Sequence, residues 1–156
     1  MLQKTNQRER GFTIIEVLIV LAIAGLILLI VFLAVPALQR NSRNQAVKND
    51  VANVVGGIGE FQGANNGTLP SRVGTDDSTP GLVKYSRNGG NETSIKIQGS
   101  TTVSSTTNAP SSTAPELGNV IVSLGFRCDG TASPRAVAAI FAVETSGGSV
   151  RQCSES

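Results

Sequence analysis

The sequence predicts an α+β protein, with one long N-terminal helix and a head whose C-terminal part is an antiparallel sheet of about four strands. Three observations predict this class. An apolar run fills residues 12–35, a helical pattern continues to Phe61, and short apolar segments separated by turn residues fill the last third. The chain has 156 residues. Without the N-terminal apolar anchor, about 115 residues remain, which is enough for one compact head.

The apolar run is long enough to cross a membrane. From Val17 to Val35 there is no charged, amide or hydroxyl side chain, and a helix needs about 20 apolar residues to cross the hydrocarbon core. Glu16 is the single acid at the start of this run. An ionisable group there costs up to about 3 kcal/mol unless it finds a partner. Glu16 therefore needs a specific partner.

Pro36 follows the apolar run, and the helical pattern resumes beyond it. Because proline removes a backbone hydrogen bond and clashes with the preceding turn, we expect one helix that bends near Pro36. In its second half, apolar residues recur three or four positions apart, at Val47, Val51, Val54, Val55, Ile58 and Phe61. Polar residues fall mostly on the other faces, at Lys48, Asp50, Asn53 and Glu60. The second half is therefore amphipathic, which suits packing on a sheet.

Glycines interrupt the helical pattern twice. Gly56, Gly57 and Gly59 lie inside the helix and indicate either a weakened segment or close packing of its backbone against the sheet. Residues 63–67 contain the glycine and asparagine that suit a left-handed helix end. The helix is therefore expected to end near residue 62.

Residues 63–118 form a polar connection between the helix and the sheet. Two short strands are expected at 82–86 and 93–98. The tract 99–115 is dominated by Ser, Thr, Ala and Pro, and it has too little apolar surface to offset its ordering entropy. We expect a mobile or glycosylated loop there. Asp76 and Asp77 suit a solvated turn better than a calcium site, because no further oxygen ligands accompany them at suitable spacing.

Residues 119–156 contain the sheet. Apolar segments at 119–127, 136–145 and 149–153 are expected to form strands. The turns that join them contain Asp129-Gly130 with Ser133-Pro134, and Ser146-Gly147-Gly148. An antiparallel meander results, and one face of it would receive the apolar stripe of the helix.

The N-terminal residues Arg10-Gly11-Phe12-Thr13-Ile14-Ile15-Glu16, after a short polar leader and before an apolar helix, resemble the class III signal of type IV pilins and pseudopilins. The resemblance covers about the first 50 residues. It implies a pilin-like fold, cleavage after Gly11 by a prepilin peptidase and methylation of the new amino group of Phe12. It also implies that Glu16 pairs with that amine on a neighbouring subunit, which would match two charges that are both short of water.

This resemblance divides the chain into a cytoplasmic leader at 1–11, a membrane-spanning and filament-core helix at 12–38, its amphipathic half at 39–62 and a head at 63–156. In an exported head, the only two cysteines, Cys128 and Cys153, imply a disulfide. Many pilins have a similar C-terminal disulfide loop. A catalytic thiol is not expected, because the chain contains no histidine to activate it.

The resemblance implies a structural subunit of a type IV pilus, used in adhesion, twitching motility or DNA uptake, and not an enzyme. It would reside in the cell (inner) membrane before assembly into an extracellular filament with its own copies. Its other partners would be the prepilin peptidase, an assembly ATPase, a platform protein and membrane lipid. No cofactor or metal is expected. A minor pilin, a type II secretion pseudopilin and a membrane-anchored binding module that does not polymerise remain alternatives.

Specific nucleic-acid binding is not expected either. The formal net charge is +2, and loss of the leader removes Lys4, Arg8 and Arg10 with Glu9, which brings the sum to zero. The bases beyond residue 70 are scattered among acids, whereas strong phosphate binding needs a positive stripe.

Overall fold

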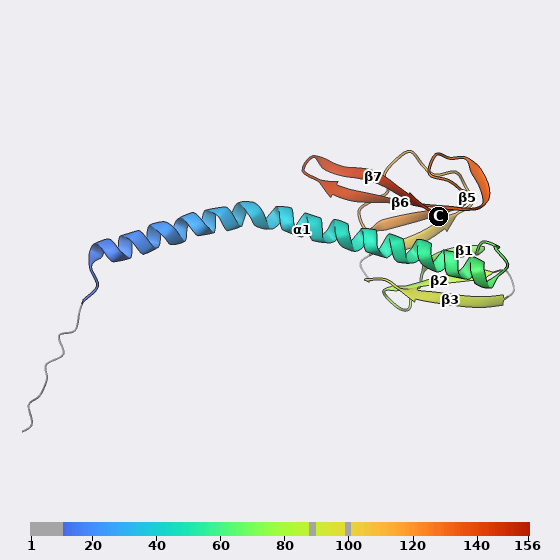
Figure 1. Ribbon diagram of the computed structural model, residues 1–156, viewed down its shortest axis with the longest axis horizontal. Helices are drawn as coiled ribbons and strands as arrows, with labels where there is room; N and C mark the ends of the chain where they lie inside the picture. The colour runs from blue at the N-terminus through green and yellow to red at the C-terminus, as the bar shows by residue number, and fades with distance from the viewer. Residues whose placement is uncertain (1–10, 88–89, 99–100) are drawn as a thin grey trace, which may run out of the picture. The chain divides into compact units, whose positions relative to one another are not determined.

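The computed structural model describes residues 11–87, 90–98 and 101–156, and these residues form one helix and seven strands. Figure 1 shows how the helix and strands follow one another along the chain. The chain divides into two compact units, Met1–Gln39 and Arg40–Ser156. The predicted leader lies outside the described residues except for Gly11. The elements in order are α1 (Ile14–Ala64), β1 (Arg72–Thr75), β2 (Leu82–Arg87), β3 (Gly90–Lys96), β4 (Thr102–Thr106), β5 (Asn119–Phe126), β6 (Ala132–Thr145) and β7 (Gly148–Glu155). The predicted α+β class is confirmed.

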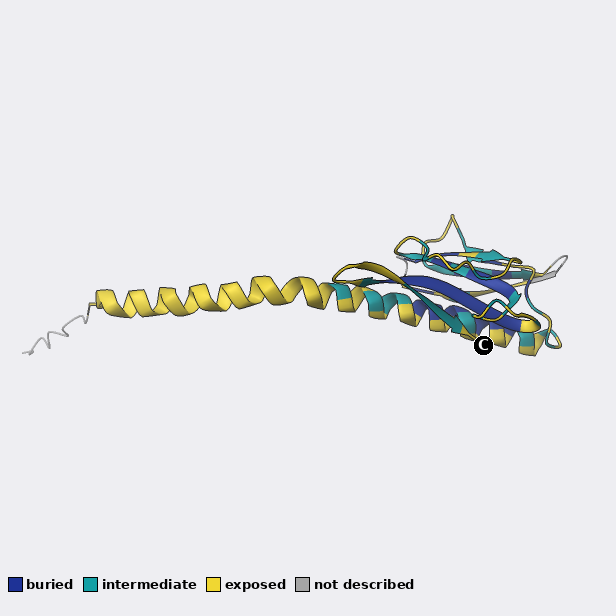
Figure 2. Ribbon diagram, turned by 90° about the horizontal axis from the view of Figure 1, so that it is seen from above, coloured by how far each residue is buried: buried dark blue, intermediate teal, exposed yellow. Residues whose placement is uncertain are grey.

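The helix α1 is continuous, and Pro36 lies inside it. Its surface changes along its length, as Figure 2 shows: the first half is exposed, and buried positions begin in the second half. The end of the helix follows the predicted chemistry, because Asn66 and Gly67 have positive φ angles of 56° and 76°. The Gly67 N–H donates to the Gln62 carbonyl at 2.7 Å, which satisfies a carbonyl of the last helical turn.

The strands form two sheets. The first has the order β1-β2-β3 and is antiparallel, and the second has the order β4-β5-β6-β7. In the second sheet β5, β6 and β7 form the predicted antiparallel meander, but β4 pairs with β5 in parallel. The predicted sheet of about four strands is therefore present, with two differences from the prediction. The four-stranded sheet is mixed, and three further strands form a sheet of their own.

The boundaries of two strands also differ from the prediction. The strand expected at 93–98 is β3, which runs from Gly90 to Lys96. The strand expected at 136–145 is β6, which begins four residues earlier at Ala132. Ser133 and Pro134, predicted as part of a turn, therefore lie in β6. The pairing of β5 with β6 shifts register between Leu124 and Phe126, which allows the strand to extend past its apolar segment.

The two sheets meet where β1 lies beside β4, and side chains join them there. The Val73 N–H donates to Ser105 Oγ at 2.8 Å, and Thr75 Oγ1 donates to the Val103 carbonyl at 3.4 Å. These hydroxyls supply hydrogen bonds between strands that share no backbone ladder. The tract 99–115, expected to be a mobile or glycosylated loop, thus contains strand β4, and the Ser105 hydroxyl of this strand accepts a hydrogen bond from a backbone N–H of β1.

The core lies between the second half of α1 and both sheets (Figure 2). The predicted apolar stripe is confirmed, since Val51, Val54, Ile58 and Phe61 are at most 2% exposed. Tyr85 of β2 is fully buried, and its hydroxyl donates to the Val54 carbonyl at 3.2 Å. The remaining core side chains are mainly valines and other aliphatic residues of the two sheets. Burial of this stripe against the strands stabilises the head.

The opposite face of the second sheet is covered as well. Ala138 and Ile140 are at most 1% exposed, although they alternate along β6 with the residues that face the helix. Arg151 of β7 pairs with Ala142 and so points to this same face, where its Nε donates to the Ser111 carbonyl at 2.8 Å. The segment between β4 and β5 therefore passes over this face. The unbroken apolar run of β6 suits a strand that is buried on both faces.

Asp50 is the clearest exception to the predicted helix faces. It was expected among the polar residues that fall mostly away from the core, yet it is fully buried. Its Oδ1 accepts a hydrogen bond from the Gln98 N–H at 2.9 Å, and its Oδ2 accepts one from Thr101 Oγ1 at 2.6 Å. Asp50 thus holds the chain on both sides of the connection between β3 and β4, and these hydrogen bonds offset part of the cost of burying a carboxylate.

Candidate functional site

The segment that precedes the helix is accessible. Gly11, Phe12 and Thr13 lie before the first residue of α1, and the Phe12 side chain is 84% exposed. A Cβ built on Gly11 would meet no other atom within 4 Å. The peptide bond between Gly11 and Phe12 is therefore open to a protease, and no element of the described chain covers it.

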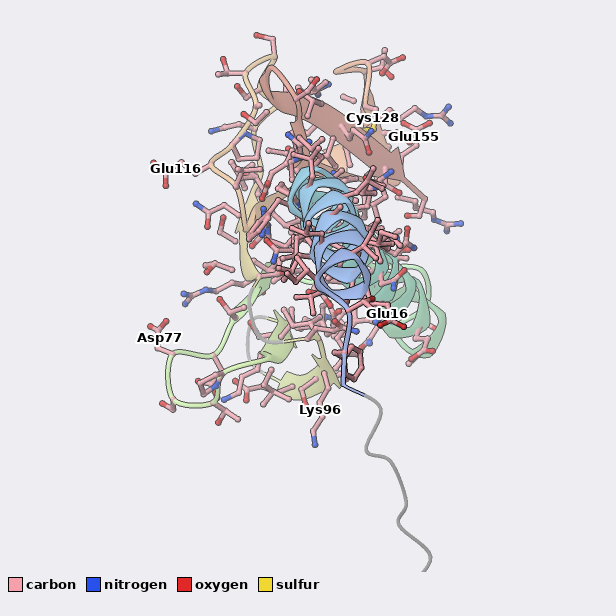
Figure 3. The ribbon with its side chains drawn as sticks, turned by 90° about the vertical axis from the view of Figure 1, so that its left-hand side faces the viewer. Glu16, Asp77, Lys96, Glu116, Cys128 and Glu155 are labelled. Atoms are coloured by element: carbon pink, nitrogen blue, oxygen red, sulfur yellow. A yellow bond between two sulfur atoms is a disulfide. The ribbon has the colours of Figure 1, made fainter. Side chains whose placement is uncertain are left out.

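Glu16 lies in the first turn of α1 (Figure 3), where it binds Thr13. The Thr13 N–H donates to Glu16 Oε2 at 3.0 Å, and the Thr13 hydroxyl donates to the same oxygen at 2.7 Å. A Ser or Thr followed three residues later by Glu forms a capping box, in which the acid satisfies the N–H of the residue that begins the helix. Glu16 therefore has a partner within its own chain.

Sequence reasoning missed Thr13. The signal was present, because Thr13-Ile14-Ile15-Glu16 fits the capping-box spacing directly in front of an apolar run. The prediction gave Glu16 only a partner on a neighbouring subunit, the amino group of Phe12. The structure shows that the first partner is local.

The first half of α1 has an apolar surface on every side. Every large apolar side chain from Ile14 to Leu38 is at least 39% exposed. This helix contains a segment long and apolar enough to cross a membrane. A helix that is apolar all round requires either lipid or other helices around it.

Comparison with known proteins identifies this segment. Residues 6–32 match the family model described as the prokaryotic N-terminal methylation motif. The chain carries a class III signal of the type IV pilin kind. The methylation motif includes Gly11, Phe12, Thr13 and Glu16 and ends inside the apolar half of α1. No curated protein and no solved structure matches the chain.

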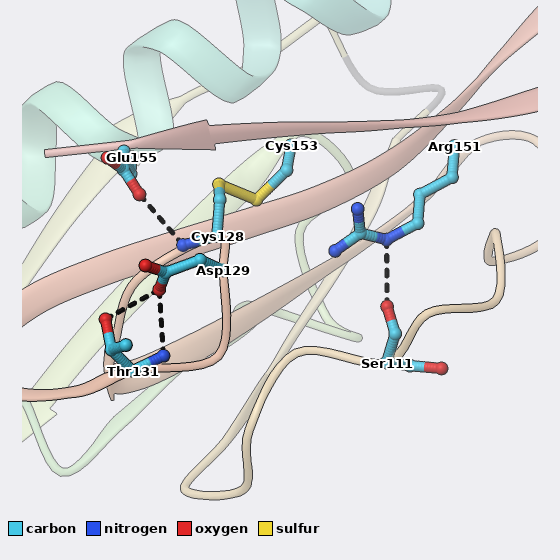
Figure 4. Close-up of a disulfide and its surroundings, with 7 residues drawn as sticks. All are labelled: Ser111, Cys128, Asp129, Thr131, Arg151, Cys153 and Glu155. Carbon is cyan, nitrogen blue, oxygen red and sulfur yellow. Dashed lines mark hydrogen bonds between the residues drawn. A yellow bond between two sulfur atoms is a disulfide. The ribbon is translucent and has the colours of Figure 1, made fainter.

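In the head, Cys128 and Cys153 form a disulfide with a Cα–Cα distance of 5.9 Å (Figure 4). It links the turn after β5 to strand β7. Glu155 reinforces this link, because its Oε2 accepts a hydrogen bond from the Cys128 N–H at 2.8 Å. In the same turn, Asp129 accepts hydrogen bonds from the Thr131 N–H and hydroxyl, and these lower the pKa of Asp129. The disulfide therefore closes a well-ordered turn.

The acid pair at Asp76 and Asp77 lies in the connection between β1 and β2 (Figure 3). Asp76 accepts a hydrogen bond from the Ser78 N–H and pairs with Lys84 at 3.2 Å. Both contacts, with that of Ser78 the larger, lower the pKa of Asp76. Within residues 11–87, 90–98 and 101–156, no group of three or more His, Cys, Asp or Glu could hold a metal ion.

A polar cluster at Glu144 joins the helix to the end of β6. Arg43 makes a two-pronged ion pair with the Glu144 carboxylate, with both N–O distances at 2.7 Å. Asn44 binds the backbone of the same residue, donating to its carbonyl at 2.8 Å and accepting from its N–H at 2.7 Å. The hydrogen bonds from Arg43 lower the pKa of Glu144. Sequence reasoning missed this cluster, since its partners lie about 100 residues apart.

Proposed function

We propose that this chain is the precursor of a structural subunit of a type IV pilus. A prepilin peptidase cuts it after Gly11 and methylates the amino group of Phe12. The mature chain then polymerises through its N-terminal helix into a surface filament. The observation that carries this proposal is the exposed apolar surface from Ile14 to Leu38, directly behind a methylation motif. An ordinary secretory signal peptide is cut after its apolar segment, so the mature protein would not keep such a surface.

The apolar helix has two environments in this proposal. Lipid of the cell (inner) membrane surrounds it before assembly, and helices of neighbouring copies surround it in the extracellular filament. Transfer from lipid to the filament core gains little hydrophobic free energy, because both environments are apolar. An assembly ATPase and a platform membrane protein would drive the transfer. Pro36, whose ring removes one hydrogen bond of the helix, is the position where the helix would bend as it packs.

Glu16 would guide the docking of a new subunit. Both hydrogen bonds from Thr13 reach Glu16 Oε2, and in this proposal Oε1 accepts the methylated amine of Phe12 from a neighbour. Thr13 lowers the cost of keeping the carboxylate in lipid, and the neighbour's amine supplies the opposite charge. Removing one partner of such a pair leaves an uncompensated charge in apolar surroundings, which is strongly unfavourable.

The disulfide of Cys128 and Cys153 would stabilise the head after export, since disulfides persist in oxidising compartments. It would close a 25-residue loop. The disulfide and the long polar connection between helix and sheet favour a pilin over a major type II secretion pseudopilin. A role as a minor pilin would differ only in the abundance of the chain within the filament.

Two variants test the proposal in cells that contain a prepilin peptidase and a pilus assembly system. Gly11→Val should accumulate as an uncut, membrane-held precursor. Glu16→Ala should be cut normally but should yield few or no filaments by electron microscopy. Glu60→Ala is the matched control, because Glu60 is an exposed glutamate on the same helix but lies outside the methylation motif.

The outcomes separate the functions. Loss of filaments with Glu16→Ala but not with Glu60→Ala supports assembly through Glu16. Filaments of normal number and length from Glu16→Ala would contradict that role. If the wild-type chain is never cut and never enters a filament, it acts as a membrane-anchored binding module instead.

A further inference from the structure

The head has an apolar groove beside the Glu144 cluster. Its volume is about 210 Å³, and it lies between the second half of α1, the two residues just before β5 and the end of β6. The surface of the groove is mainly apolar, and one ion pair lies at its rim. The residues concerned are Ala46, Val47, Leu117 and Ala142 in the groove and Arg43 and Glu144 at the rim.

The groove is already formed in the single chain. Arg43 and Asn44 on α1 hold Glu144 on β6 through four hydrogen bonds of 2.7 to 2.8 Å. Asn44 binds both backbone groups of Glu144, at a position beyond the last residue of β6 that pairs with β5. The two walls are therefore fixed relative to each other. A partner that enters such a groove avoids the cost of ordering it.

Leu117 gives the groove an exposed apolar surface. It is 51% exposed, and among the described residues of the head only Val150, at 50%, is a comparably exposed large apolar side chain. The two charged groups that line the rim, Arg43 and Glu144, are paired with each other, so neither is free to bind an ionic ligand. An apolar group is the occupant that its chemistry favours.

We propose that this groove receives an apolar side chain from the N-terminal helix, residues 12–38, of a second copy of this chain. The inference rests on the proposed function, which brings the helices of several copies together. In the described chain, all exposed large apolar side chains other than Leu117 and Val150 lie between Phe12 and Leu38. A second copy can thus fill the groove with an apolar group chiefly from this helix.

The size of the groove fits such an occupant. A cavity of about 150 Å³ in another protein holds a benzene ring, and this groove is larger. A phenylalanine or branched aliphatic side chain can therefore enter it. Phe12 and Phe32 are 84% and 76% exposed, and each could supply an aromatic ring. The contact would place the head of one subunit against the helix of another.

Photo-crosslinking in assembled filaments tests this contact. The photoreactive amino acid p-benzoylphenylalanine replaces Leu117 in the full chain, and filaments are sheared from cells, irradiated and analysed by mass spectrometry. The matched control carries the same probe in place of Val150, which is equally exposed but does not line the groove. A third variant carries the probe at Ala46, on the opposite wall, in case the probe at 117 obstructs assembly.

We expect the probes at 117 and 46 to shift the chain to dimer mass, with adducts in residues 12–38 of the second copy, and the probe at 150 to give no such adduct. Filaments can form normally while the probe at 117 gives adducts only with lipid, only with the head of the second copy, or not at all. Each of these results would overturn the groove contact and leave the proposed function standing. Absence of filaments from the wild-type chain would overturn both.

Discussion

Gly57 and Gly59 lie two residues apart in the same helix, and the structure predicts opposite effects when each is replaced by alanine. A Cβ on Gly57 would lie 2.6 Å from Tyr85 Oη, 3.0 Å from Tyr85 Cζ and 3.1 Å from Ile95 Cγ2. Tyr85 is fully buried and cannot swing away into solvent. A Cβ on Gly59 would meet no atom within 4 Å. Gly57 therefore leaves the space that the Tyr85 ring occupies, whereas Gly59 makes no such contact and only lowers the stability of the helix.

The magnitudes follow from these contacts. Overpacking at Gly57 costs about 1–3 kcal/mol, and displacing Tyr85 from the Val54 carbonyl leaves a buried hydroxyl unpaired at about 1–3 kcal/mol. Better helix propensity returns about 1 kcal/mol. Gly57→Ala should thus lower the free energy of unfolding by about 1–5 kcal/mol, whereas Gly59→Ala should raise it by about 1 kcal/mol. For a head of this size the midpoints should shift by roughly −10 °C and +4 °C.

Tyrosine fluorescence provides the assay, because Tyr85 is the only tyrosine and the chain has no tryptophan. The full chain in detergent is heated, and the fluorescence reports the environment of this one buried side chain. Gly59→Ala is the control for helix propensity at an exposed position. Equal shifts of the same sign for both variants would refute the argument that Gly57 is required by the Tyr85 ring.

Three further predictions concern the stability of the head. Reduction of the disulfide between Cys128 and Cys153 should lower the melting midpoint by about 10–15 °C, from about 3.5 kcal/mol of loop entropy; an unchanged midpoint would contradict this. Burial raises the pKa of Tyr85 above its ordinary 10.0, so stability should hold up to about pH 10 and fall above it. Tyrosinate absorbance should therefore appear only with unfolding, and a tyrosinate signal from the folded head would contradict it. Asp50→Ala should cost about 2–4 kcal/mol in urea unfolding, since it leaves the buried Thr101 hydroxyl and the part-buried Gln98 N–H unpaired. Thr101→Val, which removes one donor, should cost less.

Patterns that repeat along the chain predicted most of the fold. The stripe from Val47 to Phe61 could be predicted because helical spacing places apolar residues on one face. The meander of β5, β6 and β7 could be predicted because turn residues separate apolar segments. The methylation motif could be recognised because a charged, glycine-containing leader directly precedes an apolar helix. These features depend on residues close together in sequence.

The contacts that sequence reasoning missed join residues far apart in the chain. Sequence alone predicts a surface position for Asp50, because its hydrogen-bond donors, Gln98 and Thr101, lie 48 and 51 residues later in the chain. Strand β4 was missed because serine and threonine have little apolar surface, and its order depends on β5 and on the hydroxyl contact to Val73. Tertiary pairing decides such cases, and composition alone does not reveal it.

The segment that matches the methylation motif was predicted from sequence only in part. Its position and its acid could be predicted from sequence, and the family model covers the same residues. The interaction between Thr13 and Glu16 was predictable from the capping-box spacing but was overlooked. The groove beside Leu117 could not be predicted, since its walls come from α1, the residues before β5 and strand β6, and the Asn44 side chain holds the backbone of β6 against α1.

Mass analysis of the N-terminus of the native protein tests the central claim most directly. Filaments or membranes from the native cell provide the chain, and the measured mass and N-terminal fragments define its first residue. Cleavage after Gly11 and methylation of the new amino group would give a chain that begins at Phe12 with a methylated amine. A chain that keeps Met1, or any residue before Phe12, in an assembled filament would contradict it.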